Sequence, residues 1–85
     1  MINNAAVMNT PEERTKDNYE LQFATNHLAH FLLFYLLKDL LLEGSTPDFH
    51  SRVVNISSIG HRASPIRFDD VHFEKGGYNG WVACK

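Results

Sequence analysis

Several features that would classify a small protein at once are scarce in this chain. Its 85 residues include one cysteine, Cys84, so no internal disulfide can compensate for a small core. The net charge of −2 gives no electrostatic basis for binding nucleic acid. The longest uninterrupted apolar run, residues 31–37, is too short to cross a bilayer. Residues 1–4 lack a basic region followed by an apolar core, so we expect no signal peptide and a cytoplasmic location.

A short segment rich in valine and isoleucine ends in two serines. Its lack of polar alternation favours a strand buried on both faces, as in a parallel sheet, and we predict this strand over 52–57. Ser57 and Ser58 would then stand at the carboxyl end of the strand, where ligands bind in open α/β sheets. The alternative interpretation is a strand that simply stops at a turn.

The longest regular pattern is helical and covers about residues 19–42. Asp17 and Glu20 have the spacing of a capping box, and Gly44 follows as a stop signal. Residues 31–37 are all apolar, so the helix is apolar on every side there and needs partners in several directions. We therefore expect this helix to belong to a core or to mediate self-association.

The order of these elements predicts the fold class. Residues 1–4 read as the end of a strand, and residues 59–80 read as an irregular excursion with turn or helical pieces around 68–74. Residues 81–85 look like the opening of another element. Strand, helix and strand in this order predict an α/β fold with one truncated βαβ unit, in which the long helix forms the crossover between two parallel strands.

Three motifs together carry a family resemblance. They are the Asn-Asn-Ala-Ala segment at 3–6, the helix asparagine Asn26, and the Asn-Ile-Ser-Ser segment at 55–58. In this order and at this spacing they resemble the short-chain dehydrogenase/reductases. Residues 20–33 and 57–62 are most similar to the branch that contains retinol dehydrogenases and the WW-domain oxidoreductase. The resemblance extends over essentially the whole chain and corresponds to the middle third of the family's length.

The resemblance implies a fold, a reaction and a set of site residues. The fold would be a partial, Rossmann-like doubly wound domain over residues 1–85, and the reaction would be hydride transfer between NAD(P) and a carbonyl or alcohol, with a retinoid-like apolar molecule among the candidates. Asn26 matches the tetrad asparagine that holds a water in the proton relay, and Ser58 matches the serine that hydrogen-bonds the substrate oxygen. The motif beside the cofactor would be formed by Asn3, Asn4, Ala5 and Ala6.

Two positions depart from the family pattern. Ala6 replaces a glycine, and its added methyl is either tolerated or crowds the ribose. A Tyr-x-x-x-Lys motif should close the tetrad, with the tyrosine as general acid/base and the lysine lowering the tyrosine pKa. Here the chain reads Ala83-Cys84-Lys85, so either Cys84 replaces the tyrosine or one residue has been lost before it.

A glycine-rich phosphate loop does not occur in the 85 residues. We therefore expect the isolated chain to bind no NAD(P) and to be inactive. The alternative is a non-enzymatic interaction module, or a truncated gene product without its own activity.

The remaining reactive side chains have ordinary interpretations. His27 and His30 share a helix face, but no second cluster completes a ligand set, so we expect no metal site. Cys84 has no base at motif spacing and is better explained as a small packed or terminal thiol than as a nucleophile. His61 and Arg62 follow Ser58 closely and are either surface residues or part of a substrate cleft.

Overall fold

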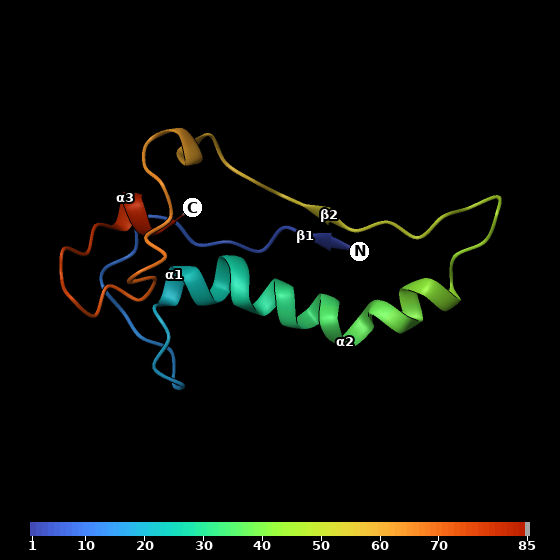
Figure 1. Cartoon of the computed structure of the whole chain (residues 1–85), viewed down its shortest axis with the longest axis horizontal. Helices are drawn as coiled ribbons and strands as arrows, with labels where there is room; N and C mark the ends of the chain where they lie inside the picture. The colour runs from blue at the N-terminus through green and yellow to red at the C-terminus, as the bar shows by residue number, and fades with distance from the viewer. Residues whose placement is uncertain (85) are drawn as a thin grey trace.

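The computed structural model describes residues 1–84 of the chain. The strand β1 (Ile2–Asn3) is followed by a long loop and three consecutive helical pieces, and then by the strand β2 (Val54–Asn55). A 3₁₀ turn, η2 (Ile59–Arg62), and the short helix α3 (Gly80–Ala83) lie in the last third. The order strand, helix, strand is therefore the one predicted (Figure 1).

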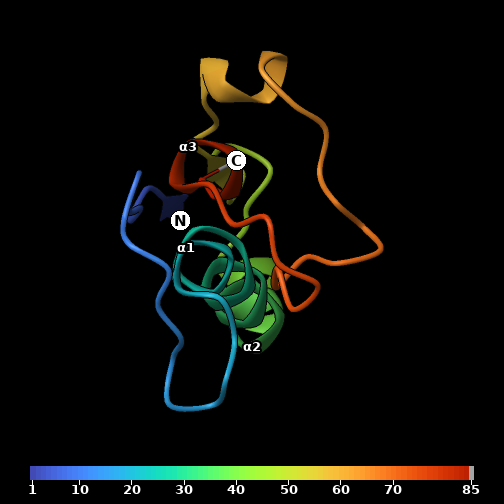
Figure 2. The same ribbon diagram turned by 90° about the vertical axis from the view of Figure 1, so that its left-hand side faces the viewer.

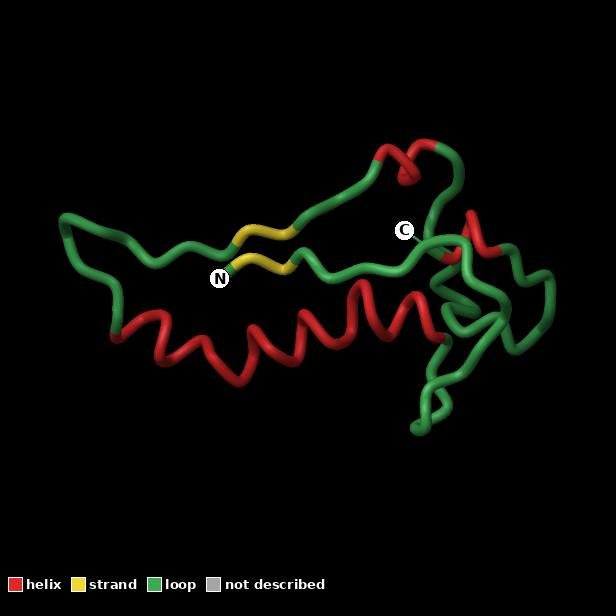
Figure 3. Tube along the Cα trace, turned by 180° about the vertical axis from the view of Figure 1, so that it is seen from behind, coloured by secondary structure: helices red, strands yellow, loops and turns green. Residues whose placement is uncertain are grey.

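The two strands form a parallel pair. Ile2 lies opposite Val54, and Asn3 lies opposite Asn55. The ladder is extended on both sides, because the Val54 amide donates to the Met1 carbonyl and the Ile56 amide to the Asn3 carbonyl, each at 3.0 Å. The prediction of a parallel pair is confirmed, although the paired strand is shorter than 52–57. Figure 3 shows both extended segments running beside the helix that connects them.

The connecting helix is made of α1 (Leu21–Phe23), the π-helical turn η1 (Ala24–Leu28) and α2 (Ala29–Glu43). It begins at Leu21, and the predicted cap at Asp17 is wrong. Glu20 is the N-cap instead, since its carboxylate accepts from the main-chain amides of Gln22 and Phe23. Asn18 has a φ of 66°, in the left-handed region, so the chain before Tyr19 forms a turn and cannot continue the helix.

Most apolar residues of the helix and strand are not covered by the described part of the chain. None of the residues of α2 is buried, and Phe31, the first residue of the apolar run 31–37, is 62% exposed. Val54 in β2 is 45% exposed, so the prediction of a strand buried on both faces is wrong for this structure. The radius of gyration is 15.2 Å, whereas a compact domain of this length has about 12 Å. The fold is an elongated βαβ unit.

The buried residues lie mainly at one end of the molecule, among α1, α3 and the segment 59–80. Figure 2 views the molecule from this end. Among residues 1–84 the buried apolar side chains are Phe73 and Ala83, and the buried polar ones include Glu20, Gln22 and Asp70. This end is therefore built from polar contacts as much as from apolar packing. No helix in the part described here is both long and apolar enough to cross a membrane.

Candidate functional site

A cavity of about 610 Å³ lies between the helix and the two extended segments. It is lined by residues from distant parts of the sequence, and all six predicted site residues are among them: Asn3, Asn4, Ala5, Ala6, Asn26 and Ser58. This volume lies within the range of small-molecule sites, about 300–1,000 Å³. The fold therefore brings the residues of the three motifs to one place.

Asn26 lies in the middle of the π-helical turn. Its side-chain amide pairs with the main chain of Val7, because Nδ2 donates to the Val7 carbonyl and Oδ1 accepts from the Val7 amide, both at 2.9 Å. Nδ2 also approaches the Cys84 carbonyl at 3.5 Å. The Asn26 carbonyl lies 3.0 Å from Nδ1 of His30. A π-helical turn is often found at functional sites, and here it sets the asparagine against two other segments.

Ser58 lies where the extended segment after β2 meets η2. Its Oγ accepts from the Gly60 amide at 3.1 Å, so Ser58 is the N-cap of that 3₁₀ turn. The same hydroxyl carries a proton that it can donate to a ligand oxygen. The imidazole of His61 lies with Nδ1 2.6 Å from the Ser58 carbonyl. The backbone on either side of the hydroxyl is thus held in one conformation.

The segment 3–6 forms the wall at the end of β1. Asn3 is 4% exposed, and its Nδ2 donates to Oδ1 of Asn55 on the paired strand at 2.7 Å. Its own Oδ1 is buried with no protein partner. Asn4, Ala5 and Ala6 are exposed along the cavity. The pair of asparagines therefore fixes the two strand ends relative to each other.

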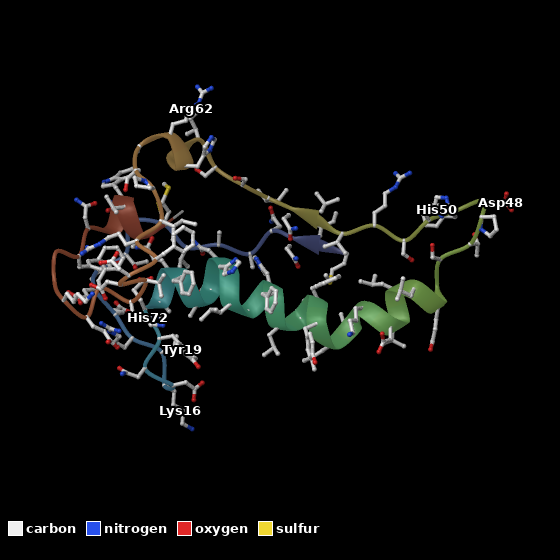
Figure 4. The ribbon with its side chains drawn as sticks, in the orientation of Figure 1. Lys16, Tyr19, Asp48, His50, Arg62 and His72 are labelled. Atoms are coloured by element: carbon white, nitrogen blue, oxygen red, sulfur yellow. The ribbon has the colours of Figure 1, made fainter. Side chains whose placement is uncertain are left out.

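Residues that were not predicted as site residues also line the cavity, among them His27, His30 and Cys84. For His30 a signal was available, because it follows Asn26 by four residues on one helix. His61 lines the cavity, as expected if it belongs to a substrate cleft. Arg62 does not line the cavity, and its side chain points away from the ribbon in Figure 4. Lys85 lies outside the described residues.

Among residues 1–84, the one clearly shifted pKa belongs to Asp70, away from the cavity. Burial raises the pKa of the Asp70 carboxyl, but hydrogen bonds from the Lys75 and Glu74 amides and the charge of Arg67 outweigh burial, so the pKa is lowered. The two amides lie at 3.0 and 2.8 Å, and the guanidinium of Arg67 at 3.8 Å. Within residues 1–84, no three His, Cys, Asp or Glu side chains are grouped so that they could hold a metal ion.

Comparisons with known proteins agree on one family. The chain is 49% identical over 83 residues to the short-chain dehydrogenase/reductase prx1 of Penicillium roqueforti, covering 98% of the chain and 24% of that protein. It is 48% identical over 79 residues to human retinol dehydrogenase 13, covering 93% of the chain and 23% of the relative. It is 44% identical over 71 residues to human polyprenol dehydrogenase, covering 84% and 22%. No family model matches the chain.

A solved structure has the same fold. A crystal structure of an uncharacterised protein from Mycobacterium paratuberculosis superposes with a TM-score of 0.80 at 36% identity, over 98% of this chain and 28% of the other. The fold and cavity define an α/β unit with a ligand-sized site beside a parallel strand pair. By sequence, the chain belongs to the short-chain dehydrogenase/reductase family. It spans about a quarter of the length of the curated relatives it matches.

Proposed function

We propose that this chain forms the central section of a Rossmann-like NAD(P)-dependent oxidoreductase site that transfers hydride to or from a carbonyl or alcohol. The observation that carries the proposal is the common cavity of the residues at 3–6, Asn26 and Ser58. These residues come from three separate segments of the chain, and all of them match motifs of the family. The relatives called retinol and polyprenol dehydrogenases suggest an apolar alcohol as the substrate class.

Each residue has a defined part in the proposal. The Ser58 hydroxyl, fixed by its cap on Gly60, donates to the substrate oxygen. Asn26, held by Val7, supports a water in the proton relay. When an alcohol is oxidised it loses a hydride and a proton, and the proton needs an acceptor. In this chain Cys84 lines the cavity where the family pattern expects the phenol of a tyrosine. The proton acceptor is therefore the function for which the chain offers the poorest side chain.

The lining of the cavity fits the nicotinamide and its ribose better than the pyrophosphate of NAD(P). Asn4, Ala5 and Ala6 form a small, exposed wall against which a nicotinamide and its ribose would lie, and the bound cofactor would supply the hydride chemistry. The described cavity lining includes no lysine or arginine for a pyrophosphate. We therefore propose that the 85-residue chain by itself has no measurable affinity for NAD(P) and does not turn over. Saturable binding in a calorimetric titration with either dinucleotide would contradict this.

The oxidoreductase proposal is tested by a chimera. Residues 1–85 replace the matching segment of human retinol dehydrogenase 13, and retinol oxidation is measured. We expect the chimera to be slower than the parent by about 10²–10⁴-fold, the contribution of general acid/base catalysis. Cys84→Tyr restores the rate if the cysteine replaces the tyrosine, whereas a tyrosine inserted before Cys84 restores it if a residue was lost. If neither version is active while the chimera folds, the proposal is wrong.

A second candidate function is supported by the exposed apolar surface of α2. Leu36 is 65% exposed and Leu40 is 63% exposed, which favours an interaction module that associates through this helix. Size-exclusion chromatography with light scattering on the purified chain distinguishes this candidate from a monomer. A monomeric chain with a cooperative thermal transition would exclude it. The cytoplasmic location stays a prediction under either function.

A further inference from the structure

A buried glutamine and a tyrosine join three segments at the end of the molecule opposite the free end of α2. Gln22 is fully buried, with 0% exposure. Its Nε2 donates to the hydroxyl of Tyr78 at 2.8 Å and to the Gly80 carbonyl at 3.0 Å. The side chain thus spans from the first turn of the long helix to the first residue of α3. We call this pair the Gln22–Tyr78 clamp.

The tyrosine extends the clamp to the loop before the helix. The Tyr78 hydroxyl accepts from Gln22 and donates to the Thr10 carbonyl at 3.0 Å or the Pro11 carbonyl at 3.2 Å. Its ring packs edge-on against Phe73, with centroids 5.4 Å apart. Both functions of the hydroxyl, as donor and acceptor, are therefore used inside the protein.

The clamp holds α3 in direct contact with the same loop. A Cβ built on Gly80 would lie 2.8 Å from Oδ1 of Asn9 and 2.9 Å from the Thr10 carbonyl. Real side-chain carbons do not approach other atoms so closely, so the backbone of α3 is seated against residues 9–10 without space for a side chain. The start of α3 is therefore packed tightly against this loop.

The other end of α3 is held by a second side-chain amide. Asn26 follows Gln22 by four residues, so both lie on the same face of the helix. Nδ2 of Asn26 approaches the Cys84 carbonyl at 3.5 Å, and its main contacts are with Val7. Two amides one helical turn apart therefore hold α3 at Gly80 and at Cys84.

We propose that Gln22 and Tyr78 are positioning residues, which fix α3 and thereby set the Cys84 wall of the cavity relative to Asn26. Neither side chain lines the cavity, so both act through the backbone of α3. Any effect on turnover rests on the proposed oxidoreductase function, whereas the geometric effect does not. In this proposal, Gln22 and Tyr78 position residues of the cavity lining without belonging to that lining themselves.

The single cysteine provides a direct measurement, because its alkylation by iodoacetamide reports how well α3 is held. In the full 85-residue chain, Tyr78→Phe and Gln22→Met remove the hydrogen bonds with little change in shape. We expect each to accelerate alkylation of Cys84 about three- to tenfold, the effect of one or two lost hydrogen bonds. The double variant should be close to the single ones, because the two side chains act as a unit. Tyr35→Phe, at a 59% exposed tyrosine on α2, is the matched control and leaves the rate unchanged.

Circular dichroism decides between local and global effects. The proposal requires the far-ultraviolet spectrum of Tyr78→Phe to match the parent while alkylation accelerates. Equal alkylation rates in parent and variants overturn it, and so does loss of the helical spectrum, because the clamp would then support the whole fold rather than α3.

A second readout uses whichever chimera is active, the one with Cys84→Tyr or the one with a tyrosine inserted before Cys84. There, Tyr78→Phe lowers kcat several-fold and changes KM for retinol less than twofold, since it displaces the proton-transfer position and not the substrate pocket. An unchanged kcat, or a loss confined to KM, overturns the assigned role. If neither the Cys84→Tyr version nor the version with a tyrosine inserted before Cys84 is active although the chimera folds, the oxidoreductase proposal fails, and the thiol measurement still decides the clamp.

Discussion

The two ends of this molecule are built on different principles. At the end that contains α1 and α3, the buried side chains are largely polar: Glu20 and Gln22 are fully covered, the Glu20 carboxylate accepts from main-chain amides, and Nε2 of Gln22 donates to Tyr78 and to the Gly80 carbonyl. At the other end, α2 and β2 are rich in apolar residues, yet Leu36 and Leu42 are 65% and 72% exposed. Figure 1 shows the second end as one helix beside two extended segments.

The difference indicates which interactions stabilise the structure of each end. Capping and side-chain amides fix local geometry within the chain, so hydrogen bonds between its own segments contribute to the order of the first end. The second end has the composition of a core without the layers that cover one, because an apolar helix and a parallel strand are stabilised mainly by burial. Substitutions at the first end should therefore alter stability, whereas substitutions at the second should alter association.

The largest effect is expected at Gly80, where the backbone of α3 meets residues 9–10. Gly80→Ala places a Cβ 2.8 Å from the Asn9 side chain and 2.9 Å from the Thr10 carbonyl. Because one of these atoms belongs to the main chain, we expect a loss of about 1–3 kcal/mol in the free energy of unfolding by urea. Gly60→Ala is the control, since its Cβ meets nothing closer than 3.4 Å. Equal destabilisation by both would show that the contact at Gly80 is not tight.

The next effect concerns the start of the long helix. Glu20→Ala removes the carboxylate that accepts from the Gln22 and Phe23 amides at 2.9 and 2.6 Å. We expect a loss of about 1–2 kcal/mol and a lower helical signal. Asp17→Ala, at the cap that the sequence pattern suggested, should change stability by less than about 0.5 kcal/mol. The reverse ranking would restore Asp17 as the cap.

A smaller effect on the free energy of unfolding is expected when the pH is lowered and Asp70 becomes protonated. The folded pKa of this carboxyl lies below its ordinary value of 3.8, so its contribution to stability is present above that value and is lost as the pH falls through the lowered pKa. Asp70→Asn should flatten this acid limb of the stability profile. Asp69→Asn, at a carboxyl whose side chain is 75% exposed, should leave it in place. Parallel profiles for the parent and Asp70→Asn would contradict the lowered pKa.

The smallest change in stability is expected at the second end. Leu36→Lys together with Leu40→Lys introduces two charges at positions that are 65% and 63% exposed. The unfolding free energy of the monomer should change by less than about 0.5 kcal/mol, while light scattering should report less self-association than in the parent. Phe68→Lys, which adds a charge at an 84% exposed site outside α2, is the control. Unchanged association in the double variant would mean that this helix face is not the contact.

Several features of the fold follow from local pattern alone. The helix up to Gly44, the extended segment that contains Val54 and the turn at Ser58 are specified by periodicity, β-propensity and a small polar cap. The family pattern predicted the motif residues that line the cavity. The cap was mispredicted because Asp17 and Glu20 have the spacing of a capping box, whereas Asn18 in the left-handed conformation keeps Asp17 out of the helix and Glu20 itself caps it.

The sequence by itself determined which residues are helical or extended and which motifs they carry, because these depend on neighbours a few positions away. Only the tertiary structure decided that Gln22 reaches Tyr78 across 56 positions and that Asn26 reaches Val7 across 19. Such contacts depend on where the chain returns in space. A side-chain amide has the same propensity in the sequence whether it faces water or joins two segments, so its role becomes visible only when its partners are in place.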